Sequence, residues 1–260
     1  MLNYMKSEGY RILHSRGMYL FTGITAAAVF FLNWLLSCQG QIPYATAHFS
    51  LGMLVGSPML YCYMALLAAG IMFGEDRKNG MMKNAVVYGI TGPVIFMGKC
   101  MVGIFAAACS LIVIMTAYVG SARLFLPMEE MELRAVLLEI PAMSLIAGAA
   151  MMLGILVLDA VEKTAAGIVV WFFLVIGIPR GLLYLSHVLQ SELLKEAALL
   201  FPENFLAEEV RVTLGGYAIL WDTPQGMMKC LVSGATGILV FTAAGILAVS
   251  YTHLTLPTKA

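Results

Sequence analysis

Apolar residues gather into six long runs along the chain, and polar residues concentrate in the stretches between them. The runs cover residues 18–36, 51–73, 94–118, 136–158, 165–187 and 229–249. A helix needs about 20 mostly apolar residues to cross the hydrocarbon core of a bilayer, and runs this continuous lack the alternation of a membrane barrel strand. Only helices then satisfy the backbone in lipid. We therefore predict an all-α integral membrane protein with six transmembrane helices.

The remaining segments predict surface elements. Residues 1–17 mix apolar with basic positions, which is typical of a short interfacial helix lying on the membrane surface. Residues 188–228, before the last run, are semi-apolar and predict one or two amphipathic helices broken at Pro202. The fifth run is the weakest of the six because IPRG interrupts it at 178–181.

Lysine and arginine set the predicted orientation, because cytoplasmic flanks carry an excess of these residues. The N-terminal segment is basic, and Arg77, Lys78 and Lys83 follow the second run, whereas the loop 37–50 contains no lysine or arginine. We therefore expect both termini and the loop after the second helix in the cytoplasm. The semi-apolar segment before the last helix is then expected on the outer face.

Composition agrees with a membrane protein and excludes several functions. The 260 residues are 61% hydrophobic and 12% charged, against about 25% charged in soluble domains. Zero net charge gives no sign of a nucleic-acid partner, and five scattered cysteines favour neither a disulfide framework nor a zinc site. The chain lacks GxxxxGK[ST], HExxH and GxSxG. We therefore expect no catalytic site, no metal and no cofactor bound directly, with the lipid bilayer as a partner.

Charged residues in or beside apolar runs are candidate functional residues, because they are costly in lipid. Lys99 lies about one helical turn into the third run, from where its side chain can extend to the cytoplasmic interface. Arg180, in the outer part of the fifth run, is expected to reach the outer headgroups or, alternatively, to contact substrate on its pathway. Asp159 and Glu162 bound a very short loop and are interpreted as solvated helix ends.

Small residues four positions apart permit close approach of helices. Ser233 and Gly237 in the sixth run have this spacing, and Gly148 lies in a similar setting in the fourth. The pattern fits packing within one chain and a seam between two chains equally well.

Residues 73–84, FGEDRKNGMMKN, contain four consecutive charged residues. With the residues that follow, this stretch resembles the cytoplasmic loop after the second span in the type-2 family of ABC exporter permeases. That family has a glutamate ending the second span, then a glycine and a basic residue, a proline-containing turn, and a Gly-Lys pair opening the third span. The matching positions are Glu75, Gly80, Lys83, Gly92-Pro93 and Gly98-Lys99. The layout of six spans, interfacial N-terminal helix and semi-apolar outer loop is similar to that family too.

The resemblance implies that residues 1–250 form a single transmembrane permease domain, the membrane-spanning subunit of an ATP-driven exporter. It implies a multi-pass protein of a bacterial inner (plasma) membrane that forms a dimer with a second copy or a homologous permease. ATP and Mg²⁺ would be bound by a separate cytoplasmic ABC ATPase. The cargo that the family implies is a hydrophobic or amphipathic compound such as a peptide antibiotic.

The resemblance also implies that the charged loop couples the chain to the ATPase. The residues assigned to this coupling are Glu75, Asp76, Arg77, Lys78, Gly80, Lys83 and Lys99. The basic residues fit plain topology signals near anionic lipid as well. Two other functions stay open: a membrane scaffold or sensor subunit that transports nothing, and a secondary transporter, which paired broken helices would favour.

The last ten residues, 251–260, read YTHLTLPTKA and are polar and rich in threonine, unlike the rest of the chain. They resemble a tail that recurs on unrelated environmental sequences through sequencing-adapter read-through. We expect this tail to be non-native and assign it no function.

Overall fold

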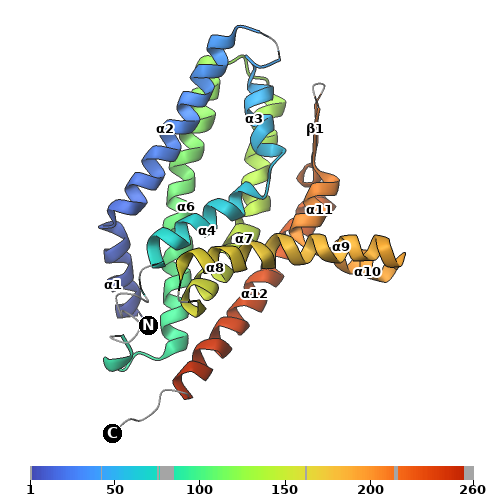
Figure 1. The fold of residues 1–260 in the computed structure, drawn as a ribbon. Coiled ribbons are helices and arrows are strands. Elements are labelled where there is room, and N and C mark those ends of the chain that lie inside the picture. Colours follow the sequence, from blue (N-terminus) through green and yellow to red (C-terminus); the bar gives the residue numbers. More distant parts are fainter. Residues whose placement is uncertain are drawn as a thin grey trace.

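The computed structural model describes residues 2–41, 43–74, 76, 85–161, 163–213 and 216–254, with side chains up to residue 248. Helices make up most of the described chain, which confirms the all-α prediction in its coarse form (Figure 1). The bounds are α1 (Leu2–Leu13), α2 (Arg16–Gln39), α3 (Ala47–Val55), α4 (Leu60–Phe73), α6 (Gly92–Phe125), α7 (Glu130–Ala160), α8 (Thr164–Phe172), the π-helical turn η1 (Phe173–Gly177), α9 (Ile178–Leu189), α10 (Glu192–Ala198), α11 (Pro202–Glu209), β1 (Arg211–Thr213), β2 (Gly216–Ala218), the 3-10 turn η2 (Leu220–Asp222) and α12 (Pro224–Leu254).

Among the described residues, five helical segments are long and apolar enough to cross a membrane. They are α2, α6, α7, the continuous segment from α8 to α9, and α12. The pair α3 and α4 supplies a sixth if the two bent helices count as one span. These segments cover the six predicted runs. The prediction of a multi-helix membrane protein is confirmed at this level.

The second run is not the single helix that its apolar composition predicts. Helix α3 ends at Val55, α4 begins at Leu60, and the two axes differ in direction by 68°. Gly56 and Pro58 explain the break. Proline has no N–H to donate and disfavours helical geometry in the residue before it. The chain therefore leaves α3 and starts α4 in a new direction.

The fifth run stays helical through IPRG, contrary to the interruption that the sequence predicts. The N–H of Ile178 donates to the carbonyl of Phe173, five residues back, which defines the π turn η1. This wide turn changes the hydrogen-bond register just before Pro179, whose nitrogen has no hydrogen to donate. The proline is accommodated by a local change of register, and the helix continues to Leu189.

The long segment before the last helix is partly as predicted. Two short helices, α10 and α11, are separated just before Pro202, where a break was predicted, because α11 begins at that proline. The antiparallel hairpin of β1 and β2, which pairs Val212 with Tyr217, was not predicted. Figure 1 shows α9 and α10 running across the direction of α2, α6 and α7.

Helix α7 forms the centre of the packing. It has the largest buried share of the candidate spans, with 67% of its most apolar stretch buried. It packs against α4 and α12, while α2 and α6 lie side by side. The indole N–H of Trp171, on α8, donates to the carbonyl of Ala150 on α7 at 2.9 Å. The core of the molecule therefore follows α7.

Small residues bring α12 close to α7 within one chain. A Cβ built on Gly237 would lie 2.8 Å from the Cβ of Ala149, and one on Gly234 would lie 2.6 Å from the backbone nitrogen of Ile146. Real Cβ atoms essentially never lie this close to another heavy atom, so a side chain at either position would force the helices apart. Gly234 and Gly237 therefore serve packing within the chain, which is one of the two interpretations that the sequence left open for Gly237.

A buried polar cluster connects α2, α3 and α6. Asn33 on α2 is fully buried, and its Nδ2 donates to the carbonyl of Tyr118 at 3.0 Å and to Oγ of Ser121 at 2.7 Å. Its Oδ1 accepts a hydrogen bond from Oγ of Ser50 on α3. One amide thus satisfies groups on two neighbouring helices.

Replacing Asn33 with alanine is expected to lower the free energy of unfolding by about 1–2 kcal/mol, because groups on α3 and α6 each lose one of their buried partners. Unfolding of the purified chain in detergent, followed by circular dichroism, measures the change. The control is Thr116→Ala on α6, where the exposed hydroxyl bonds only to the carbonyl of Ile112 in its own helix. Equal stability of the Asn33 variant and the wild type would contradict the prediction.

Candidate coupling site

Two of the predicted coupling residues lie within the described chain, and they are in contact. Nζ of Lys99, near the start of α6, lies 3.1 Å from Oδ2 of Asp76, which follows α4. The other predicted coupling residues fall outside the described residues; they are Glu75, Arg77, Lys78, Gly80 and Lys83. Their role in coupling stays a prediction.

Lys99 is buried between two carboxylates. Its side chain is 2% exposed, and Nζ also lies 2.9 Å from Oδ1 of Asp159 at the end of α7. The sequence-based interpretation that Lys99 extends to the interface is therefore wrong. The interpretation of Asp159 as a solvated helix end is wrong too, since only 10% of its side chain is exposed. A buried ammonium is tolerated here because carboxylates replace the water it has lost.

Arg11 on α1 extends the cluster to the N-terminal helix. Its Nη1 lies 2.6 Å from Oδ1 of Asp76, and its Nη2 lies 2.6 Å from Oε2 of Glu8. Nη1 also donates to the carbonyl of Met72, in the last turn of α4, at 3.1 Å. Burial lowers the pKa of Arg11, but Asp76 and Glu8 outweigh this effect and raise it overall. The guanidinium is therefore a permanent positive charge between two carboxylates.

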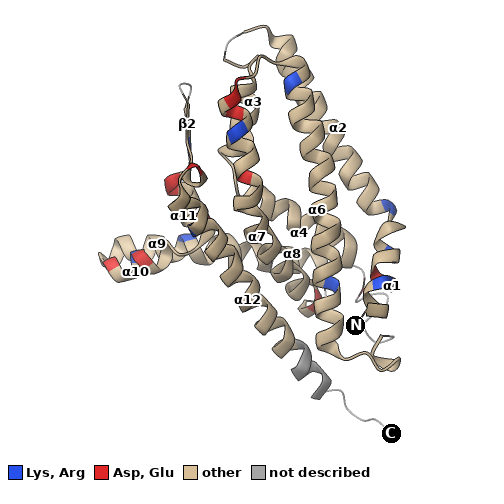
Figure 2. Ribbon diagram, turned by 180° about the vertical axis from the view of Figure 1, so that it is seen from behind, with Lys and Arg blue, Asp and Glu red and all other residues tan. Residues whose placement is uncertain are grey.

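We call Glu8, Arg11, Asp76, Lys99 and Asp159 the ion-pair network. It connects α1, the segment that follows α4, the start of α6 and the end of α7. Figure 2 shows acidic and basic parts of the ribbon meeting where α1, α6 and α7 come together near the N-terminus. The ring of Phe73 supports both cations, since Cζ of Arg11 and Nζ of Lys99 lie 5.4 and 5.6 Å from its centre.

Local packing places α1 against α6 beside the network. A Cβ built on Gly98 would lie 2.7 Å from Cδ1 of Tyr4, so this glycine leaves room for the tyrosine ring. Burial, and next the charge of Glu8, raise the pKa of the Tyr4 hydroxyl. The Gly98-Lys99 pair that opens the third predicted span therefore has two structural uses. The glycine admits α1, and the lysine binds the carboxylates.

The network can act as a mechanical connection. Asp76 binds cations of two different helices at once, and Lys99 binds a second carboxylate on a third helix. A displacement of the segment that begins after α4 therefore pulls on α1, α6 and α7 together. Buried ion pairs resist separation because parting them leaves an uncompensated charge.

Arg180 lies apart from this network. Its Nη2 is 2.5 Å from Oε1 of Glu203 on α11, and its side chain is 64% exposed while that of Glu203 is 3% exposed. The pair attaches the start of α9 to α11. Arg180 is not among the residues that line the cavity described next, and its assignment to a substrate pathway stays a prediction.

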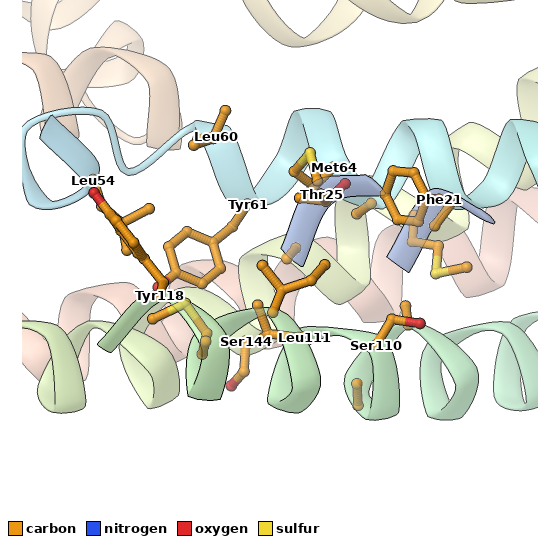
Figure 3. Close-up of a pocket in the computed structure, with 18 of the residues that line it drawn as sticks. Phe21, Thr25, Leu54, Leu60, Tyr61, Met64, Ser110, Leu111, Tyr118 and Ser144 are labelled. Carbon is orange, nitrogen blue, oxygen red and sulfur yellow. The ribbon is translucent and has the colours of Figure 1, made fainter. Parts of the chain in front are cut away.

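Two further features of the described chain were missed in the sequence. A cavity of about 390 Å³ lies between α2, α4, α6 and α7 (Figure 3). Glu139 on α7 is fully buried, and neither of its carboxylate oxygens has a hydrogen-bond partner. Its position within the fourth apolar run was a signal, because an acid inside a membrane span is costly and usually functional.

No protein-family model and no curated protein matches the chain. Within the part of the chain that the structure describes, no group of three or more histidine, cysteine or acidic side chains is placed to hold a metal ion. The chain is a multi-helix apolar protein with five candidate membrane spans among its described residues, or six with the bent pair.

Proposed function

We propose that this chain is the membrane-spanning permease subunit of an ATP-driven ABC exporter. It works as a dimer, with a second copy or a homologous permease, in a bacterial plasma membrane. The ion-pair network carries the proposal: Asp76 belongs to the loop that resembles a coupling segment, and it is bonded to Arg11 and Lys99. A loop that receives force from outside needs such fixed attachments to the spans.

In this mechanism, a cytoplasmic ABC ATPase binds ATP and Mg²⁺ and docks on the segment 75–92. Closure of the ATPase moves that segment, and the network passes the movement to α1, α6 and α7 as near-rigid bodies. The spans then rock and open the pathway to the other face. The mostly apolar wall of the cavity supports a hydrophobic or amphipathic cargo.

The docking step is tested by the triple variant Glu75→Ala, Lys78→Ala and Lys83→Ala. We expect loss of co-purification with an ABC ATPase encoded beside this chain, and loss of the ATPase stimulation that the reconstituted wild-type pair shows. These substitutions remove the charges that pair with the ATPase surface.

The matched control is Glu192→Ala and Lys195→Ala on α10 with Arg211→Ala on β1, which removes the same number and signs of charge. It is predicted to lie on the opposite face and should leave ATPase binding and stimulation unchanged. Wild-type assembly and stimulation in the triple variant of the loop would overturn the docking proposal.

A secondary transporter is the second candidate, and the broken pair α3 and α4 favours it. Discontinuous helices form ion and substrate sites in many such transporters, usually as two related pairs. One bent pair of this kind occurs in the described ranges. Transport by the chain alone in vesicles, driven by an ion gradient without ATPase, would establish this candidate. Absence of transport both with the ATPase and with an ion gradient alone would leave a scaffold or sensor subunit.

A further inference from the structure

The cavity between α2, α4, α6 and α7 has the size of a small-molecule site and is elongated along the helices. Its volume of about 390 Å³ falls within the range of ligand pockets. The α2 residues on its wall extend from Phe21 to Leu32, which is about 16 Å along the helix axis. Figure 3 shows Tyr61 reaching from α4 toward α6 across this space. An apolar cavity of about 150 Å³ in another protein holds benzene, so this one has room for roughly fifteen non-hydrogen atoms.

The wall of the cavity carries no charge. Among the described residues, those that line it include no lysine, arginine, histidine, aspartate or glutamate. The ion-pair network and the buried Glu139 of α7 both lie off this wall. A charged group that entered the cavity would leave water without meeting an opposite charge, which is costly. The wall therefore disfavours a charged occupant.

The few hydroxyl groups on the wall are largely engaged within the protein. Tyr118 donates to a backbone carbonyl on α3, and Ser144 donates to the carbonyl of Pro141 at 2.9 Å. Ser110 accepts a hydrogen bond from Thr22 at 2.9 Å. An occupant with several polar groups would lose its hydrogen bonds to water and find few replacements here. The wall therefore disfavours a strongly polar occupant as well.

Apolar side chains face the cavity from several sides. Met64 on α4, Leu111 on α6 and Met151 on α7 all contribute to its wall. Methionine side chains are flexible and adapt to the shape of what they contact. Removing apolar surface of a guest from water is favourable, and dry apolar cavities in proteins bind apolar guests. The chemistry of the wall thus selects a molecule of its own kind.

We propose that the cavity binds one uncharged apolar molecule, a hydrocarbon-like body of roughly ten to fifteen non-hydrogen atoms with at most one hydroxyl group. This narrows the hydrophobic or amphipathic cargo of the proposed function, and calling the occupant cargo rests on that function. Binding itself needs no ATPase and is measured on this chain alone. Failure of binding would therefore leave the coupling proposal standing, and failure of ATPase docking would leave the binding site standing.

The test uses a neutral photoreactive probe, adamantane carrying a diazirine, with the full chain in lipid nanodiscs. Illumination attaches the probe to nearby side chains, and mass spectrometry of the peptides identifies the labelled residues. We expect labelling of Met64, Leu111 and Met151 to saturate as the probe concentration rises, because the cavity has a limited volume. Labelling of lipid-facing residues should rise in proportion to the probe, because it reflects partition into the bilayer alone.

Two competitors of one shape test the exclusion of charge. 1-Adamantanol is uncharged, whereas 1-adamantylamine carries an ammonium group at neutral pH. At equal amounts in the bilayer, we expect the alcohol to lower labelling of the three wall residues by about tenfold and the amine by less than about twofold, because the wall offers the ammonium no opposite charge. Equal competition by the two compounds would overturn the proposal, and this comparison needs no variant to fold.

Filling the cavity tests where the probe binds. Ala107→Phe places a ring at the α6 wall and should lower labelling of Met64 and Met151 by about tenfold, because the occupant loses its space. The matched control is Ala28→Phe, the same change at an exposed position of α2 off the wall, which should leave labelling unchanged. Unchanged labelling in folded Ala107→Phe would contradict the proposal. Wall residues of the wild type that show no saturable labelling, as expected if lipid chains fill the cavity, would overturn it too.

Discussion

Replacing Lys99 with methionine is expected to lower the free energy of unfolding by about 3–5 kcal/mol, the usual cost of removing one partner from a buried ion pair. The ammonium is 2% exposed and lies 2.9 Å from Asp159 and 3.1 Å from Asp76. Methionine keeps the length of the side chain but removes the charge. The carboxylate of Asp159 then stays in the interior without its ammonium. Unfolding of the purified chain in detergent measures the loss.

The matched control is Lys195→Met on α10. Its ammonium is 41% exposed and lies 3.9 Å from a carboxylate oxygen of Glu192, and exposed pairs of this kind contribute at most about 1 kcal/mol. Adding Asp159→Asn to Lys99→Met should recover part of the lost stability, because the carboxylate charge that faced the ammonium is then removed as well. Equal stability of Lys99→Met and Lys195→Met would show that the network does not support the fold.

Replacing Gly234 with valine is expected to separate α12 from α7 and to cost about 2–3 kcal/mol, in the range of overpacked cores. A Cβ at this position would lie 2.6 Å from the backbone nitrogen of Ile146, which no side-chain rotation can relieve. The whole helix must therefore move. Unfolding in detergent measures the stability. The separation of α7 and α12 is measured by spectroscopy, from the distance between labels on one cysteine introduced in each helix.

Gly120→Val on α6 is the control for this substitution. A Cβ built there would meet nothing within 4 Å, and both changes place a β-branched residue within a long helix. The intrinsic cost for helix formation therefore cancels between the two variants. If both variants unfold equally, close packing of α12 against α7 does not stabilise the chain.

The membrane helices could be predicted from the sequence because their signal is local. Length and apolar composition of a run determine whether it can span lipid, and each predicted run corresponds to a helix or a helix pair. Whether a helix breaks, changes its hydrogen-bond register or begins at a given proline could not be predicted equally well. Pro58 lies in the break between α3 and α4, Pro179 follows a π turn within a helix, and Pro202 begins a helix. Neighbouring packing and hydrogen bonds, rather than the proline itself, decide among these outcomes.

The candidate site was predictable only in part, because its contacts join distant positions. Asp76 and Lys99 belong to one recognisable stretch, but Asp159 is 60 residues from Lys99, and Arg11 is 65 residues from Asp76. Nothing in a single sequence pairs such charges. Glu139 was different, since an acid within an apolar run is visible without a structure. Its importance lies in the lack of a partner, which only the folded chain reveals.

The long separation between Lys99 and Asp159 also sets an order for biogenesis. The ribosome completes α6, with its ammonium, before it has made the carboxylate at the end of α7. Lys99 has two carboxylate partners, and until α7 is made Asp76 is the one already present. The N-terminal helix, made first, can find its final place only after Asp76 has emerged. The earliest segment of the chain therefore settles only after the second apolar run has been made, and insertion of α7 completes the charge balance of a helix synthesised before it.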